Sequence, residues 1–241
     1  MATYVLVHGA MVGGWCWRWV TPELRAAGHD VYTPTLTGLG ERVHLASPSV
    51  DLDTHIQDVV NMLRYEDLTE VVLVGWSYGG MVVAGVADRE PERVAQLVYL
   101  DADVPRDGEM SSPDSRVAAR QELARLHGDG WLLPIPPVMT NVKNRILSTL
   151  PQADARWIAE RYTPQPLKTW LQPIRLAGAA DSIPTTYIRC LDGCDPTDED
   201  TQRQDARIRS EPSWTYWEMQ APHAVPFTEP KALAQLLLRF S

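Results

Sequence analysis

The stretch from Val72 to Met81 constrains the fold more than any other part of the chain. It reads VLVGWSYGGM, so one serine, Ser77, stands between Gly75 and Gly79 at the end of an apolar run. An uninterrupted apolar run is typical of a strand that is covered on both faces of a parallel sheet. The two glycines allow a tight turn from this strand into the next helix, with the serine raised above the edge of the sheet.

Strand and helix patterns alternate on both sides of this stretch. We expect strands at 4–8, 30–34, 71–75, 94–101, 185–190 and 214–219, with helices at about 17–27, 52–64, 80–89, 198–209 and 231–240. This order predicts an α/β fold, a doubly wound, mostly parallel sheet with helices on both faces. Between residues 105 and 182 the alternation stops, and helical patterns at 115–126 and 153–162 flank a proline-rich apolar loop. We therefore expect a core of residues 1–104 and 183–241, with 105–182 inserted as a mainly helical cap.

The composition restricts the possible partners. The 241 residues fit one domain, and a formal net charge of −9 argues against binding to nucleic acid or to an anionic membrane surface. No apolar run is long enough to span a membrane, and the N-terminus lacks a signal-peptide pattern, so we expect a soluble cytoplasmic protein. Neither a metal cluster nor a phosphate-binding loop is visible, so no cofactor is expected. A homodimer and a Cys190–Cys194 disulfide bond both remain open.

Ser77 and His223 are the candidate catalytic pair. A serine at such a turn is a candidate nucleophile because the helix behind it directs its N-terminus, and the Tyr78 N–H, at the reacting carbonyl oxygen. A general base must lie at the same edge of the sheet, and His223 follows the last expected strand. The alternatives, a turn serine and a solvated loop histidine, fit the strand–turn–helix context less well.

The acid that completes a Ser–His–Asp triad is less clear from the sequence. In this type of fold it follows the penultimate strand, where the chain offers Asp192, Asp195 and Asp198. Asp198 is typical of a helix N-cap. We favour Asp195, with Asp192 as the alternative, and Asp103 after an earlier strand is a third possibility.

The first strand ends in His8-Gly9-Ala10, whose backbone can supply a second N–H to the oxyanion. Apolar residues of the cap are the expected lining of a substrate pocket, although they are equally compatible with the core of the cap itself. The expected pocket residues are Gly9, Met11, Trp76, Trp131, Leu132, Leu133, Met139 and Ala224.

These stretches give the chain a family resemblance. Val5–Ala10, Gly14–Trp17, Gly75–Gly80, Leu97–Ala102 and Pro222-His223 resemble the α/β-hydrolases, within them the group of hydroxynitrile lyases and salicylate-type methylesterases with their bacterial esterase relatives. The resemblance implies that Ser77 is the nucleophile and His223 the base. It also implies that Ala10 and Tyr78 form the oxyanion hole.

Two departures from this group bear on the reaction. The lyases carry a threonine after the first strand's histidine and a lysine after the catalytic histidine, where this chain has Gly9 and Ala224. We therefore expect a serine hydrolase of small or medium, apolar or aromatic carboxylic esters. The alternatives are a lyase or cyclase that uses Ser77 and His223 as a proton shuttle, and a ligand sensor with vestigial activity.

Overall fold

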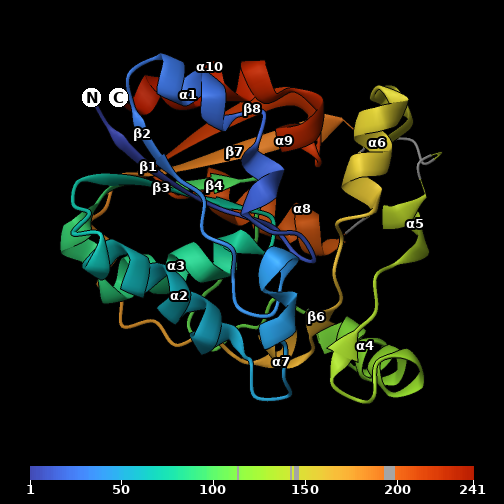
Figure 1. Cartoon of the computed structure of the whole chain (residues 1–241). Helices are drawn as coiled ribbons and strands as arrows, with labels where there is room; N and C mark the ends of the chain where they lie inside the picture. The colour runs from blue at the N-terminus through green and yellow to red at the C-terminus, as the bar shows by residue number, and fades with distance from the viewer. Residues whose placement is uncertain (113, 142, 144–146, 193–198) are drawn as a thin grey trace.

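A six-stranded parallel sheet forms the centre of the protein in a computed structural model. The structure describes residues 1–241 except 113, 142, 144–146 and 193–198. The strand order is β2-β1-β3-β4-β7-β8, and each neighbouring pair is parallel (Figure 1). The strands are β1 (Thr3–Val7), β2 (Asp30–Tyr32), β3 (Val71–Trp76), β4 (Val94–Leu100), β7 (Thr185–Asp192) and β8 (Trp214–Pro222). The predicted doubly wound α/β fold is thus confirmed.

Helices cover both faces of this sheet. In Figure 1, α1 (Thr21–Ala26) and α10 (Pro230–Leu237) lie above it, and α2 (Leu52–Tyr65) and α3 (Gly79–Arg89) lie below. The remaining core helices are α8 (Glu199–Arg209), which packs on β8, and the short α9 (Val225–Thr228).

The alternation of side chains along each strand divides the core into two halves. Val5 and Val7 of β1 pack in one cluster with α2 and α3, whereas Tyr4 and Leu6 pack in the other with α1 and α10. Successive side chains of a strand point to opposite faces, so a strand buried on both sides has to be apolar throughout. This requirement explains the unbroken apolar sequence of β3.

One expected element differs from the structure. The helix predicted at 17–27 is divided into a 3₁₀ turn (Gly14–Trp17) and α1, which begins at Thr21. Pro22 lies in the first turn of α1, where its missing N–H costs no hydrogen bond and its fixed φ favours the start of a helix.

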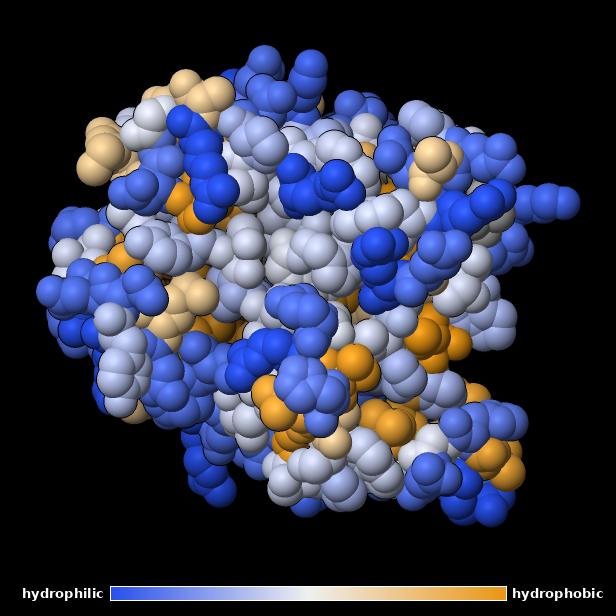
Figure 2. Space-filling view, in the orientation of Figure 1, coloured by the Kyte–Doolittle hydropathy of each residue, from blue (hydrophilic) through white to orange (hydrophobic). Residues whose placement is uncertain are grey.

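Residues 105–182, here called the cap segment, connect β4 to β7. They contain α4 (Asp114–His127), β5 (Leu132–Leu133), α5 (Pro137–Thr140), α6 (Gln152–Ala159), β6 (Gln165–Pro166) and α7 (Lys168–Leu171). Strands β5 and β6 form a separate antiparallel pair. Helices α4, α5 and α6 lie at the right of Figure 1, and hydrophobic surface is visible around α4 in Figure 2. None of the described helices is long and apolar enough to span a membrane.

Two fully buried histidines connect loops to the core. His8 accepts a hydrogen bond from the Leu36 N–H at Nε2 (3.0 Å), which leaves its Nδ1–H to donate to the Gly9 carbonyl (2.8 Å). His55 of α2 lies 2.9 Å from both the Tyr78 hydroxyl and the Thr37 carbonyl. Burial lowers the pKa of His8 to about 3 and that of His55 to about 4.

We expect stability to fall as the pH falls from about 6.5 towards 4. The unfolded chain protonates both histidines near their ordinary pKa of about 6.5, whereas the folded chain resists protonation, so acid favours unfolding. In His55→Gln, the loss of unfolding free energy between pH 7 and pH 5 should be about 2 kcal/mol smaller than in the wild type. Urea unfolding at both pH values measures it, with the exposed His127→Gln as control; equal losses in all three proteins would contradict the prediction.

Candidate active site

Ser77 occupies a strained turn between β3 and α3. Its φ is +55°, a left-handed conformation that residues with a side chain rarely adopt. A Cβ atom at Gly75 would lie 2.6 Å from the Gly79 carbonyl oxygen, and one at Gly79 would lie 2.8 Å from the carbonyl oxygens of Val7 and His8. Both glycines are therefore needed for the turn to pack, as the motif predicted.

His223 lies beside this serine, directly after β8. Its Nε2 is 3.0 Å from Ser77 Oγ. The indole N–H of Trp76 donates a hydrogen bond to the His223 carbonyl (2.9 Å), which ties the backbone of the histidine to the end of β3. The expected pairing of Ser77 with His223 is present in the structure.

Asp101 is the carboxylate that contacts the histidine. Its Oδ2 lies 2.7 Å from His223 Nδ1, and its Oδ1 accepts hydrogen bonds from Arg189 (2.9 Å) and from the Cys190 N–H (3.1 Å). Burial acts to raise the pKa of Asp101. The hydrogen bond from His223, the charges of His223 and Arg189, and the Cys190 N–H outweigh burial and lower the pKa below its ordinary value.

Of the predicted acids, the two that the structure describes have other partners. Asp192 accepts a hydrogen bond from Gln220, and Asp103 accepts one from Ser111 (2.6 Å). Asp195, the favoured prediction, lies outside the described residues. The carboxylate that contacts His223 instead follows β4, the strand next to that of the nucleophile. Strand β4 pairs with β7 through Leu100 and Ile188, and this pairing brings Asp101 beside Arg189.

The sequence holds one weak signal for Asp101, which follows an apolar strand as an acid at this sheet edge must. In the structure its φ of +43° is a conformation that aspartate tolerates better than most residues. Its partner Arg189 is a mostly buried charge that needs a carboxylate, and it also contacts Asp205 at 3.2 Å.

The proposed oxyanion donors lie on the two loops that meet at Ser77. In the part of the chain that the structure describes, the N–H groups of Ala10 and Tyr78 donate to no turn, loop or side-chain acceptor. A Cβ atom at Gly9 would lie 3.1 Å from Ser77 Cβ and 3.1 Å from a ring carbon of Trp76. The loop after β1 therefore packs so closely against Ser77 that a side chain at position 9 would be crowded.

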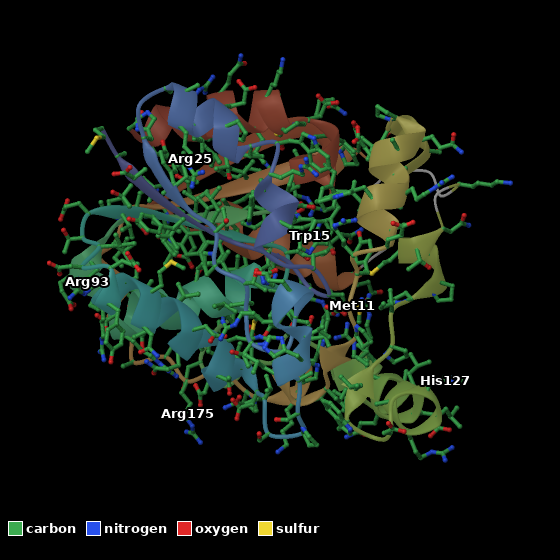
Figure 3. The ribbon with its side chains drawn as sticks, viewed as in Figure 1. Met11, Trp15, Arg25, Arg93, His127 and Arg175 are labelled. Carbon is green, nitrogen blue, oxygen red and sulfur yellow. The ribbon has the colours of Figure 1, made fainter. Side chains whose placement is uncertain are left out.

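Met11 connects this loop to the cap segment. Figure 3 labels it beside the cap. Its N–H donates to the side-chain oxygen of the buried Gln165 (2.9 Å), and its carbonyl accepts from the Thr163 N–H (2.9 Å). Gln165 in turn donates to the Thr169 hydroxyl (2.8 Å). Sequence reasoning missed Gln165, whose only signal was a polar residue in an otherwise apolar, proline-containing segment.

Among the cavities lined by described residues, three include Ser77. One of about 310 Å³ is mainly apolar and is also bordered by His223. Of the predicted pocket residues, Trp76, Met139 and Ala224 line it, together with Ala10, Val12, Val138, Leu147 and Tyr162. Trp131 and Leu133 do not line these three cavities. Leu133 is buried and pairs with Gln165, and the carbonyl of the half-buried Trp131 accepts a hydrogen bond from the Leu167 N–H.

Two polar cavities lie on the other side of the serine. One of about 240 Å³ includes Asp101, Arg189 and His223, and one of about 730 Å³ extends beneath α4 and α8. Among the described residues, no three His, Cys, Asp or Glu side chains are grouped so as to hold a metal ion.

Comparison with known proteins places this geometry in a family. Residues 4–236 match the model of the "Alpha/beta hydrolase family". The chain is 39% identical to a carbendazim hydrolyzing esterase of Nocardioides sp. (strain SG-4G) over 98% of both chains. It is 29% identical to a pheophorbidase of Raphanus sativus, covering 98% of this chain and 92% of that one.

A solved structure has the same fold. An extracellular alpha/beta-hydrolase from a Paenibacillus species, described as sharing structural and functional homology with tobacco salicylic acid binding protein 2, superposes with a TM-score of 0.82. The two are 25% identical, over 100% of this chain and 99% of that chain. This chain therefore belongs to the alpha/beta hydrolase family and is an enzyme of its carboxylic ester hydrolase class.

Proposed function

We propose that this protein hydrolyses small or medium carboxylic esters with an apolar or aromatic group, through an acyl-enzyme on Ser77. The observation that carries the proposal is the continuous contact from Ser77 Oγ through the imidazole of His223 to Asp101, with distances of 3.0 Å and 2.7 Å. Such a relay activates a serine that is otherwise a weak nucleophile.

The steps follow from this geometry. Ser77 Oγ attacks the ester carbonyl while His223 Nε2 takes its proton, and Asp101 stabilises the imidazolium that forms. The N–H groups of Ala10 and Tyr78 hold the negative oxygen of the tetrahedral intermediate. His223 then gives the proton to the leaving alkoxide. Water attacks the acyl-enzyme with His223 as base, which releases the acid and restores Ser77.

Two features support hydrolysis over lyase chemistry. A threonine side chain at position 9 would have to displace Ser77 or Trp76, because a Cβ atom there already lies 3.1 Å from both. Ala224, directly after the histidine, supplies no charge to stabilise a leaving anion. A proton-shuttle lyase would leave Ser77 without a covalent intermediate.

A fluorophosphonate probe tests the nucleophile. We expect the wild type to gain one equivalent of adduct by intact mass and to lose ester turnover, because the relay makes Ser77 reactive. Ser77→Ala should gain none, whereas Ser210→Ala, which removes an exposed serine hydroxyl, should be labelled like the wild type. A folded wild type that neither reacts nor hydrolyses any ester of a broad panel would exclude the acyl-enzyme.

Replacing the candidate acids separates Asp101 from its rivals. We expect Asp101→Asn to lower kcat by roughly 10³- to 10⁴-fold, because the amide no longer holds the imidazole as the required tautomer. Asp192→Asn and Asp195→Asn should change kcat by no more than about threefold, because Asp101 alone holds the imidazole in this proposal. A large loss in Asp195→Asn with Asp101→Asn near wild type would assign the triad to Asp195 instead.

The apolar cavity predicts a preference among substrates. A charge at Met139 would make burial of an apolar group unfavourable, so Met139→Lys should lower kcat/KM for benzyl butyrate about 10- to 100-fold relative to methyl acetate. Leu126→Lys, at an exposed position of the same cap segment, is the control. Equal losses for the two esters in Met139→Lys would remove this cavity from the substrate site.

A further inference from the structure

The largest cavity at Ser77 is rich in arginine. It has a volume of about 730 Å³, and Ser77 and Tyr78 border it. Its basic lining residues are Arg106, Arg116, Arg120, Arg203 and Arg207, and its acidic ones are Asp103, Glu109 and Asp200. Positive charge is thus in excess here, although the whole chain carries a formal net charge of −9. A cavity of one sign next to a reactive group concentrates ligands of the opposite sign.

Arg120 is the basic group whose hydrogen bonds are incomplete. Its guanidinium lies over the ring of Trp170 at 3.9 Å, and both residues line the cavity. Its Nη1 is buried and has no hydrogen-bond partner among the described residues. Burial lowers the pKa of Arg120 to about 10, so the group is still charged at neutral pH. A buried charged N–H without an acceptor is costly, and a carboxylate is a strong acceptor for it.

Two neighbouring arginines, Arg203 and Arg207, differ from Arg120 because their guanidinium groups have acceptor partners. Arg203 contacts Asp200 at 2.8 Å, and Arg207 donates to the Val104 carbonyl and lies 3.8 Å from Glu109. No described carboxylate lies within ion-pair distance of Arg120.

Asp103 is a carboxylate of this cavity that lies beside the Ser77 turn. Burial raises its pKa, an effect reduced by the hydrogen bond from Ser111 and by the charge of Arg120. Its backbone N–H donates to the Ser77 carbonyl (3.1 Å), so its position is fixed beside the turn. The Ser111 hydroxyl, which donates to Asp103 Oδ2 (2.6 Å), shares part of the negative charge that an anion in this cavity would face.

The position of His223 determines which part of a bound ester lies in which cavity at Ser77. The leaving alkoxide must receive its proton from His223, which borders the apolar cavity and the polar cavity of about 240 Å³ but not the arginine-rich one. Of the two cavities that His223 borders, the one lined by Trp76, Met139 and Ala224 suits an apolar alcohol part. The acyl part extends past Tyr78 towards Arg120.

We propose that the arginine-rich cavity binds a second carboxylate, carried by the acyl part of the substrate, through Arg120. The preferred substrates are then half-esters of dicarboxylic acids with apolar alcohols. This inference rests on the proposed function of Ser77 and His223, and it adds the substrate class.

Matched pairs of esters test the inference on the full chain. Monobenzyl succinate, glutarate and adipate are compared with benzyl butyrate, valerate and hexanoate, which have the same acyl lengths without the charge. At least one half-ester should have a kcat/KM at least about tenfold above its neutral counterpart, as for a charge-assisted hydrogen bond. No preference, or a preference for every neutral ester, would overturn the proposal.

Variants assign the preference to Arg120. Arg120→Gln should lower kcat/KM for the preferred half-ester about 10- to 100-fold and leave its neutral counterpart within about threefold, whereas Arg120→Lys should retain part of the preference. Arg125→Gln, on the exposed side of the same helix, is the matched control. Equal losses for both esters in Arg120→Gln would indicate a structural role and contradict the proposal.

A second measurement does not depend on turnover. Calorimetric titration of Ser77→Ala with glutarate should show binding that the double variant Ser77→Ala/Arg120→Gln lacks. Absence of binding by every half-ester and free diacid overturns the assignment of the cavity. If the wild type still hydrolyses benzyl valerate and is labelled at Ser77, only this inference fails. If it does neither, the proposed function fails as well.

Discussion

The strained turn at Ser77 is the constraint on which the other parts of the site depend. Ser77 holds a φ of +55° only because two glycines let β3, α3 and the loop after β1 pack against one another without side chains between them. The same packing brings the loop after β1 against the turn and presents the serine hydroxyl to His223. Packing at the edge of the sheet therefore stabilises a backbone conformation that the serine alone would avoid.

Much of this arrangement could be predicted from local sequence. Ser77 and His223 could be predicted because each follows an expected strand, and the carboxyl ends of parallel strands meet at one edge. Asp101 escaped prediction because several aspartates follow strands. Only the pairing of β4 with β7, which brings Arg189 to its carboxylate, distinguishes it from the others. Such pairing joins residues 88 positions apart, and no local pattern encodes it.

The apolar cavity could be predicted from the sequence in part, whereas the arginine-rich cavity could not, because local patterns do not show which distant segments meet. Trp76 and Ala224 adjoin Ser77 and His223 in sequence, and both line the apolar cavity. Trp131 and Leu133 were chosen for their hydrophobicity alone, which does not distinguish the core of the cap segment from a pocket wall. The arginine-rich cavity draws Asp103, Arg120, Trp170 and Arg207 from separate segments, so its charge becomes visible only when the chain is folded.

The hydrogen bonds between Met11 and the cap segment join that segment to the proposed oxyanion site. Gln165 and Thr163 hold the backbone next to Ala10 from the cap side. An outward movement of these residues would shift the proposed oxyanion donor at the same time as it admitted solvent. Removal of the cap segment would therefore disturb the loop after β1 as well as the apolar cavity, which Val138, Met139, Leu147 and Tyr162 line from the cap side.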